Sequence, residues 1–413
     1  MRKQLILALL WALLMGLPPT NAAPVRLGNE VLAATGFKAI RGKRVGLITN
    51  PSGVNSRLET TLDLLRRAPE VRLVALFAPE HGIYGDVPAG DRVESRVDTR
   101  TGLPVYSLYG ATRKPTPEML RGLDALVYDL QDTGCRSYTY ISTMGLAMEA
   151  CGEAGIEFVV LDRPNPLGGL RVEGPRVEPR FRSFVSQWDV PYVYGLTCGE
   201  LARLIVGEGW IQPRCRLTVV PMRGWRRGAV WRDTGLPWVP TSPHVPHGDS
   251  PLFQVATGML GELGGRAVST GIGYTLPFQC IAAPDVDKHR LADALNQAGL
   301  EGVRFTPVTF RPYYFAFENQ AVSGVQLFFT DPARAPLTAV NFHALEALKR
   351  VANRDLFEQA VASGRGLEMF DKVNGTDATR KALQAGRSAA EIVASWRAGE
   401  EAFRKMRAKY LLY

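Results

Sequence analysis

Cysteine and histidine are scarce in this chain, and their spacing argues against two kinds of site. The 413 residues include five cysteines and five histidines. The number of cysteines is odd and none are spaced Cys-x-x-Cys, so the sequence favours neither a zinc site nor a disulfide framework. A single disulfide stays open, because an oxidising compartment would permit one. The sequence implies no metal and no other cofactor.

Phosphate-binding glycine motifs and a basic stripe are absent as well. After the first predicted strand the chain reads TNPSGVNS, which matches neither G-x-G-x-x-G nor G-x-x-x-x-G-K-S/T. A nicotinamide or ATP enzyme is therefore not expected. The formal net charge is +9, yet the basic residues are scattered in short clusters such as Arg226-Arg227. This pattern predicts no nucleic acid partner, and leaves an acidic polymer such as cell wall as an alternative to a merely solvated surface.

A long apolar run occurs at the N-terminus. LILALLWALLMGL follows the basic start Met1-Arg2-Lys3 and precedes the small residues Thr20-Asn21-Ala22. This layout predicts a signal peptide over residues 1–22 rather than a buried helix, and the run is too short to span a bilayer. No cysteine follows the run, so no lipid anchor is expected. We expect an exported protein, periplasmic or extracellular, without a stable membrane anchor.

Strand and helix patterns alternate through the first half of the chain. Runs of aliphatic residues occur at 44–50, 71–77, 125–130 and 158–161. Stretches with helical spacing separate them, and continuous aliphatic strands predict a parallel sheet covered on both faces. We therefore expect an α/β fold that begins with a Rossmann-like, doubly wound N-terminal domain over residues 23–262.

The second half changes character. Residues 210–260 are rich in Trp and Pro, which suits either a sugar-stacking platform or a packed irregular connection. Strand patterns near 303–309 and 325–330 then precede helical stretches at 340–351 and 377–409. They predict a smaller C-terminal α/β domain over residues 263–413.

Polar residues follow each of the four predicted strands. In chain order they are Asn50, then Glu80 and His81, then Asp129, Gln131 and Asp132, then Asp162, Arg163 and Asn165. In open α/β sheets the ligand crevice lies beyond the carboxyl ends of the strands. Four strands that deliver polar side chains to one rim predict a functional site there.

A series of short motifs along the chain resembles one family, the exo-β-N-acetylmuramidases (NamZ-like; glycoside hydrolase family 171, formerly a family of unknown function). The motifs, in order, are GLITNPSGV, FAPEHGIYGD, VDTRTGLPVYSLYG, KPTPEML, YDLQDTGCRSYTYIST, VLDRPNPLGG, VEGP, DTGLPWVP and the terminal YLLY. The resemblance implies a Rossmann-like catalytic domain and a smaller C-terminal domain that closes the cleft between them. It also implies removal of non-reducing terminal N-acetylmuramic acid from peptidoglycan fragments.

That activity directs attention to carboxylates. Glycoside cleavage needs a carboxylic acid to protonate the leaving oxygen, and usually a second carboxylate as base or nucleophile. Glu80 is the best candidate for one of them, and His81 beside it would hold its charge or proton, or bind substrate. Glu173 of VEGP is the favoured second carboxylate, since its glycine- and proline-flanked loop can reach over the rim. The alternatives are Asp129, Asp132 and Asp162.

The other candidates would bind the sugar. Arg136, Arg163 and Asn165 suit the lactyl carboxylate of muramic acid, because Arg presents a planar pair of donors. Tyr138 and Tyr140 would stack on the sugar or hydrogen-bond to it. The predicted substrate site is completed by the polar strand-end residues Asn50, Asp129, Asp132 and Asp162.

One segment departs from the family pattern. Where members read FEGTN-x-SEGRGT before PFE, residues 263–279 read LGGRAVSTGIGYTLPFQ, so the expected glutamate and asparagine fall on Gly264 and Ala267. Ile272 and Tyr274 replace an arginine and a threonine, and Tyr194 stands where histidine is usual. Because most of these changes cluster, they predict altered substrate contacts or lost activity.

Three alternatives to a muramidase therefore stay open. One is a non-catalytic peptidoglycan-binding protein on the same scaffold, and another is a hydrolase with a different sugar specificity. The third is a metal-dependent phosphoesterase that uses Asp129, Asp132 and His81, for which the residue types suit Mg²⁺ or Mn²⁺. The lack of further histidine clusters disfavours it. Oligomeric state is not predicted.

Overall fold

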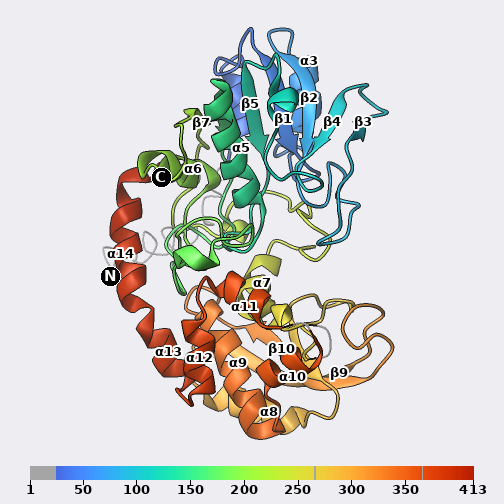
Figure 1. Cartoon of the computed structure of the whole chain (residues 1–413), viewed down its shortest axis with the longest axis vertical. Helices are drawn as coiled ribbons and strands as arrows, with labels where there is room; N and C mark the ends of the chain where they lie inside the picture. The colour runs from blue at the N-terminus through green and yellow to red at the C-terminus, as the bar shows by residue number, and fades with distance from the viewer. Residues whose placement is uncertain (1–24, 265–266, 365) are drawn as a thin grey trace, which may run out of the picture.

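The computed structural model describes residues 25–264, 267–364 and 366–413, so the predicted signal peptide lies outside the described residues. Figure 1 shows two bodies, one built on a large sheet and one on a small sheet, with helix α14 running along the side from one to the other. Within the described ranges, no helix is long and apolar enough to cross a membrane.

The N-terminal body is built on a seven-stranded sheet with the order β3-β4-β2-β1-β5-β6-β7. The strands are β1 (Arg44–Thr49), β2 (Arg72–Ala78), β3 (Arg96–Val97), β4 (Pro104–Ser107), β5 (Ala125–Asp129), β6 (Glu157–Leu161) and β7 (Arg216–Val220). All neighbouring pairs are parallel except β3 with β4. The four strands expected from aliphatic runs are β1, β2, β5 and β6, which form the centre of the sheet.

Helices cover both faces of this sheet. They are α2 (Gly28–Ala34), α3 (Thr61–Arg67), α4 (Pro117–Leu120), α5 (Tyr140–Ala154) and α6 (Cys198–Gly207), with short 3₁₀ turns at Pro179–Phe181 and Trp231–Asp233. Helices α2 and α3 pack into the core on one face, and α5 and α6 into the core on the other. The doubly wound, Rossmann-like α/β prediction is confirmed, because continuous aliphatic strands need apolar cover on both sides.

Local signals place the helix starts. Thr197 caps α6 and Glu200 closes a capping box with it, while Pro117 opens α4 behind the cap of Thr116. Side-chain oxygens at these positions accept backbone N–H groups that have no partner inside the helix. Both helix starts therefore follow from sequence.

The C-terminal body contains a three-stranded antiparallel sheet in the order β8-β10-β9. Its strands are β8 (Cys280–Ala283), β9 (Val303–Phe310) and β10 (Val322–Phe329). Its helices are α7 (Ser250–Glu262), α8 (Lys288–Gln297), α9 (Leu337–Ala352), α10 (Leu356–Ala362), α11 (Glu368–Asn374), α12 (Ala378–Gln384) and α13 (Ala389–Ser395). Sheet and helices share one hydrophobic core.

Two predicted boundaries change in the structure. Residues 250–262 were assigned to the N-terminal domain, but they form helix α7, whose buried Val255, Met259 and Leu260 belong to the C-terminal core. The C-terminal body therefore begins near residue 250. The stretch 377–409 is also three helices rather than one, because the chain turns after α12 and again between α13 and α14 (Arg397–Arg407).

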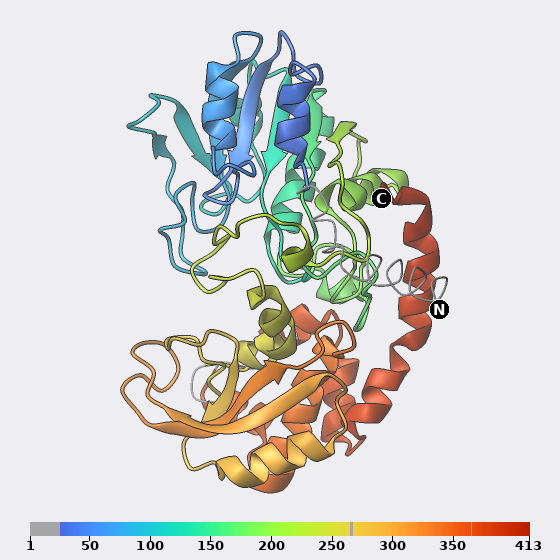
Figure 2. The ribbon, with the colours of Figure 1, turned by 180° about the vertical axis from the view of Figure 1, so that it is seen from behind.

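The last residues return to the N-terminal body. Figures 1 and 2 show α14 leaving the smaller body and running back to the larger one. Phe403 and Tyr410 are buried in the core of the N-terminal body, the latter from a final 3₁₀ turn at Ala408–Tyr410. The Tyr413 hydroxyl donates to Asp162 at 2.7 Å. A domain of residues 263–413 is therefore not one packing unit, and α14 acts as a strap between the two bodies.

The Trp-rich connection and the cysteines are packing elements. Trp225 and Trp231 are buried in a small cluster, where Trp231 meets Trp238 edge-on and Trp225 meets Tyr413 in the same way. These tryptophans form a packed connection rather than an open sugar platform. The five cysteines are all buried and free, so the structure contains no disulfide between them.

Candidate active site

Glu80 lies two residues beyond β2, at the carboxyl edge of the large sheet. Its carboxylate accepts hydrogen bonds from the Thr139 hydroxyl at 2.6 Å and from the Gly90 amide at 3.0 Å. Tyr109 lies against it from the end of neighbouring β4, and burial together with repulsion from the Glu80 carboxylate raises the pKa of Tyr109 to about 12. The tyrosine therefore stays a neutral hydroxyl, and three separate segments hold one nearly buried carboxylate in place.

His81 is fixed beside Glu80 in an unusual conformation. Its φ of 70° is rare for a residue with a side chain, and such strain persists where the surroundings determine the backbone. Nδ1 lies 2.9 Å from the Val87 carbonyl oxygen. A carbonyl can only accept, so Nδ1 carries the hydrogen, and Nε2 is the ring nitrogen that can hydrogen-bond to a ligand.

The C-terminal body reaches this rim through Tyr314, which is half exposed. Its hydroxyl lies 3.1 Å from Nε2 of His244, and the two rings are nearly parallel. Burial, and then repulsion from His81, lower the pKa of His244. A second histidine, with a lowered pKa, therefore lies near the Glu80–His81 turn where the two bodies meet.

Beneath Glu80 lies a layer of buried polar side chains, in which Asn50 and Tyr140 are hydrogen-bonded, whereas the Tyr138 hydroxyl has no hydrogen-bond partner among the described residues. Asn50 donates to the Tyr140 hydroxyl at 2.7 Å, and that hydroxyl donates to the Thr241 carbonyl at 2.6 Å. The Tyr138 ring packs edge-on against Tyr140, with centroids 4.8 Å apart. All of these side chains are buried. Their geometry favours support of the rim over direct stacking on a sugar.

Asp129 and Arg163 form a buried ion pair instead of facing a ligand. Arg163 Nε lies 2.5 Å from one carboxylate oxygen of Asp129, and Nη2 lies 3.0 Å from the other. Thr61 donates to the same carboxylate, and Val54 accepts from Nη2. Because both charged groups are already paired with protein groups, they are not free to bind a ligand. The ion pair instead connects the ends of β1, β5 and β6 beneath the rim.

Asp162 and Asn165 also serve the scaffold. Asp162 accepts from the Gly199 amide at 2.8 Å and the Thr197 hydroxyl at 2.7 Å, which places its charge at the N-terminus of α6. Asn165 donates to the Leu196 carbonyl and accepts from the Leu167 amide. Asn165 is buried and bound to the backbone, which argues against its predicted contact with the lactyl carboxylate.

Arg136 is completely buried, which argues against the predicted contact with substrate. Its guanidinium donates to four oxygens, those of Ser186, Pro175, Val190 and Val373. Burial lowers the pKa of Arg136 to about 10, which still leaves it charged. It joins the loops of the N-terminal body to α11, so we assign it a structural role.

Asp132 is a buried carboxyl with one free oxygen. Oδ2 accepts from the Gly134 amide at 2.7 Å and from the Tyr194 hydroxyl, whereas Oδ1 has no hydrogen-bond partner among the described residues. Burial raises the pKa of Asp132 to about 6. The tyrosine at position 194 thus stabilises the carboxyl of Asp132.

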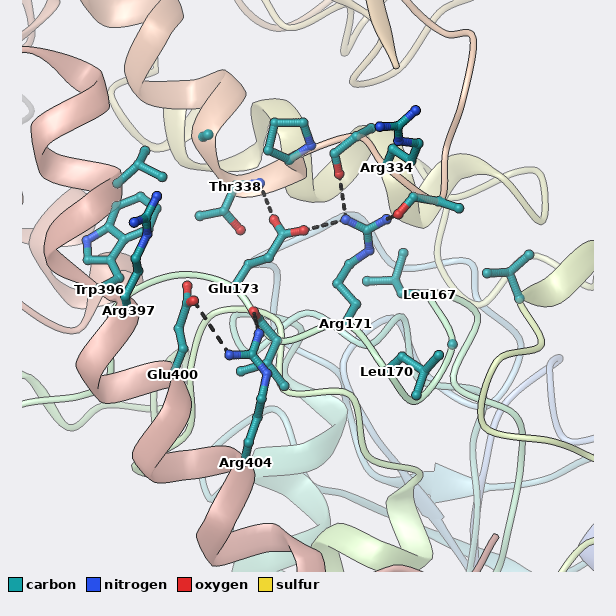
Figure 3. Close-up of a pocket in the computed structure, with 18 of the residues that line it drawn as sticks. Leu167, Leu170, Arg171, Glu173, Arg334, Thr338, Trp396, Arg397, Glu400 and Arg404 are labelled. Carbon is teal, nitrogen blue, oxygen red and sulfur yellow. Dashed lines mark hydrogen bonds and ion pairs between the residues drawn. The ribbon is translucent and has the colours of Figure 1, made fainter. Parts of the chain in front are cut away.

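Glu173, the predicted second carboxylate, lies in a different environment (Figure 3). It accepts from Arg171 and from the Thr338 amide at 2.8 Å, at the N-terminus of α9. A cavity of about 480 Å³ adjoins it, lined also by Trp396, which precedes the strap, and by Glu400 within the strap. Among the described residues Glu173 shares no hydrogen-bond partner with Glu80, and its geometry favours joining the two bodies over chemistry.

Comparison with known proteins assigns the chain to a protein family. Residues 45–249 match the family model described as exo-β-N-acetylmuramidase NamZ, N-terminal, and residues 256–413 match its C-terminal counterpart. The chain belongs to the NamZ family. It is 42% identical over 389 residues to the peptidoglycan β-N-acetylmuramidase NamZ of Bacillus subtilis (strain 168), covering 94% of this chain and 91% of that protein.

Two crystal structures support the fold of this NamZ-family chain. Both are DUF1343 family proteins from Bacteroides fragilis NCTC 9343. One has a TM-score of 0.87 at 47% identity, covering 94% of this chain and 99% of that chain. The other has a TM-score of 0.71 at 29% identity, covering 95% and 99%.

The segment that departs from the NamZ pattern lies close to the domain junction. Tyr274 stacks on Phe310 at 4.8 Å and meets the Tyr313 ring, while the Gly273 carbonyl accepts from the Tyr313 amide. Tyr313 precedes Tyr314, which bonds to His244. The sequence changes are therefore connected to the Glu80 rim through one aromatic loop.

Sequence reasoning missed four members of this cluster. Tyr109 and Thr139 lie in motifs that carried the resemblance, but strand β4 was not predicted, so Tyr109 had no assigned place. His244 lay in the Trp- and Pro-rich stretch, which was interpreted by its tryptophans. Tyr314 lies in a loop more than two hundred residues from Glu80 in the sequence, and no local pattern links them.

Proposed function

We propose that this chain is an exo-acting β-N-acetylmuramidase that releases non-reducing terminal N-acetylmuramic acid from peptidoglycan fragments. The observation that carries the proposal is the match to both NamZ family models, together with 42% identity across 94% of the chain to a protein named for this activity. The Glu80 cluster at the junction of the two bodies supplies a carboxylate suited to the chemistry.

In this proposal Glu80 transfers the proton. The bond between C1 of the muramic acid and the glycosidic oxygen breaks, and that oxygen takes a proton from the Glu80 carboxyl. Water adds its hydroxyl to C1, and its remaining proton returns to the Glu80 carboxylate. Thr139 and Gly90 hold the carboxyl in one orientation, which lowers the cost of reaching the transition state. His81 would accept a hydrogen bond from water or substrate through Nε2.

Export completes the proposal. The basic start, apolar run and small residues of 1–22 support secretion, and peptidoglycan is an extracytoplasmic polymer. We propose a periplasmic or extracellular location, with muramic-acid-terminated saccharides as the partner.

The test is hydrolysis of a chromogenic β-N-acetylmuramic acid glycoside by the mature protein and by Glu80→Gln. Glu118→Gln, at an exposed glutamate at the start of α4, is the matched control. We expect release by the wild type and the control, and a loss of at least a hundredfold in kcat for Glu80→Gln. Wild-type turnover that survives in Glu80→Gln would refute the role of Glu80. No release by the wild type would refute the activity.

A non-catalytic peptidoglycan-binding protein remains the second candidate. The observation that favours it is the divergence from the family pattern at Tyr274, whose ring meets Tyr313 in the aromatic loop that reaches the rim. A binder would show thermal stabilisation by muramyl saccharides with no turnover. Turnover by the wild type would exclude this candidate.

A further inference from the structure

Binding of muramic acid at the rim requires a partner for the lactyl carboxylate. The two arginines first expected there are unavailable, because Arg136 is fully buried among four protein oxygens and Arg163 is paired with Asp129. Any cation that recognises this carboxylate must be exposed and must lie near Glu80.

Arg113 meets both conditions. Strands β2 and β4 are parallel neighbours, with Ala78 paired to Ser107, so residues two positions beyond each pair leave the sheet side by side. Those residues are Glu80 and Tyr109. Arg113 follows Tyr109 by one turn of loop and lies over its ring, with Cζ 4.5 Å from the centroid.

The guanidinium of Arg113 is held by aromatic rings. Cζ lies 4.3 Å from the centroid of the Phe184 ring as well, and the Tyr109 and Phe184 rings are 5.8 Å apart. Contact with two rings restricts a long side chain that would otherwise sample many rotamers. The planar group is therefore already oriented before any ligand arrives.

Arg113 also lacks a carboxylate partner. The next residue, Lys114, forms ion pairs with Glu149 at 3.2 Å and Glu153 at 2.7 Å, whereas no carboxylate in the described part of the chain pairs with Arg113. Arg113 is exposed to solvent. An oriented, exposed guanidinium that has no carboxylate partner among the described residues and lies next to a candidate catalytic carboxylate is suited to bind an anionic substituent of the substrate.

We propose that Arg113 binds the lactyl carboxylate of the terminal N-acetylmuramic acid and so selects muramic acid over N-acetylglucosamine. The inference rests on the proposed function, since it concerns the same site. Tyr109 connects the proposed catalytic residue with the proposed binding residue, because its hydroxyl lies against Glu80 while its ring packs under Arg113.

The test compares Arg113→Gln and Arg113→Lys with the wild type on the chromogenic muramide. Arg121→Gln, an exposed arginine in the same region paired only loosely with Glu118, is the control. Loss of a charge-assisted, two-point contact predicts a ten- to hundredfold higher KM for Arg113→Gln, with kcat changed by less than about threefold. Arg113→Lys should recover part of the loss, and Arg121→Gln should match the wild type.

Other outcomes would overturn the inference. An unchanged KM in Arg113→Gln would show that the carboxylate is bound elsewhere. A fall in kcat at constant KM would show that Arg113 acts on Glu80 through Tyr109 and not on the ligand. Thermal unfolding of each variant separates these results from a folding defect.

Failure of the proposed function is distinguishable. If the wild type releases no chromophore, calorimetric titration with free N-acetylmuramic acid and with N-acetylglucosamine still tests the inference. Stronger binding of N-acetylmuramic acid, lost in Arg113→Gln, would support it even in a non-catalytic protein. Equal binding of the two sugars by the wild type would overturn it.

Discussion

Removal of one hydroxyl at the end of the chain should destabilise the N-terminal body. The Tyr413 hydroxyl donates to Asp162 at 2.7 Å and accepts from the Met222 amide at 2.8 Å, although Tyr413 and Asp162 are 251 residues apart. Tyr413→Phe keeps the ring, which packs edge-on against Trp225. The substitution therefore deletes two hydrogen bonds and little else.

The expected cost follows from those two contacts. A hydrogen bond to a charged group is worth about 1.5–3 kcal/mol, and a buried N–H left without an acceptor costs about 1–3 kcal/mol. Partial replacement by water reduces the sum, so we expect about 3 kcal/mol of lost unfolding free energy. Burial raises the pKa of Asp162 to about 6, so the full effect should be seen at pH 8, where the carboxylate is ionised.

The assay is urea unfolding at pH 8, followed by tryptophan fluorescence. Tyr410→Phe is the matched control, because its hydroxyl donates at 2.6 Å to Glu208, a half-buried carboxylate that keeps an ion pair with Lys409. We expect the control to cost about 1 kcal/mol or less. A Tyr413→Phe variant no less stable than Tyr410→Phe would refute the view that the chain end fastens the strap.

Two further stability measurements follow from the buried carboxyls. Asp129→Asn leaves the buried Arg163 guanidinium without its ion-pair partner, so the unfolding free energy should fall by about 3–5 kcal/mol. The control Asp63→Asn, at an exposed ion pair, should lower it by less than about 1 kcal/mol. Equal losses in the two variants would contradict the structure. Burial raises the pKa of Asp132 from 3.8 to about 6, so its contribution to stability is present below pH 4 and lost as pH rises through 6. Between pH 4 and pH 8 the wild type should lose about 3 kcal/mol relative to Asp132→Asn, and a difference independent of pH would contradict this.

The accuracy of the sequence analysis differed between strands and side chains. Aliphatic runs located β1, β2, β5 and β6, because a strand buried on both faces must be apolar along its whole length. The same reasoning placed polar residues at one rim. It did not separate those that face a ligand, because Arg163 and Glu80 look alike as polar residues after a strand. Only the partners, Asp129 for one and Thr139 for the other, distinguish them.

Domain limits were less accurate for a related reason. The apolar residues of α7 fit either core by periodicity, and only packing shows that Val255 and Met259 join the C-terminal core. Phe403 is part of a helical apolar pattern, but that pattern does not show which of the two bodies Phe403 packs against. Periodicity indicates that one face of a helix is buried, but it does not identify the element that buries that face.

The sequence by itself determined the fold class of the N-terminal body, the rim at which polar residues gather, and the family resemblance, because these depend on local patterns and ordered motifs. The tertiary structure alone decided which charges cancel inside the scaffold, how the chain end returns to Asp162, and how Tyr314 meets His244. It also placed Arg113 beside Tyr109, with no carboxylate partner in the part of the chain that the structure describes. These contacts join residues distant in sequence, and their energies depend on burial and partner geometry, which no local pattern encodes.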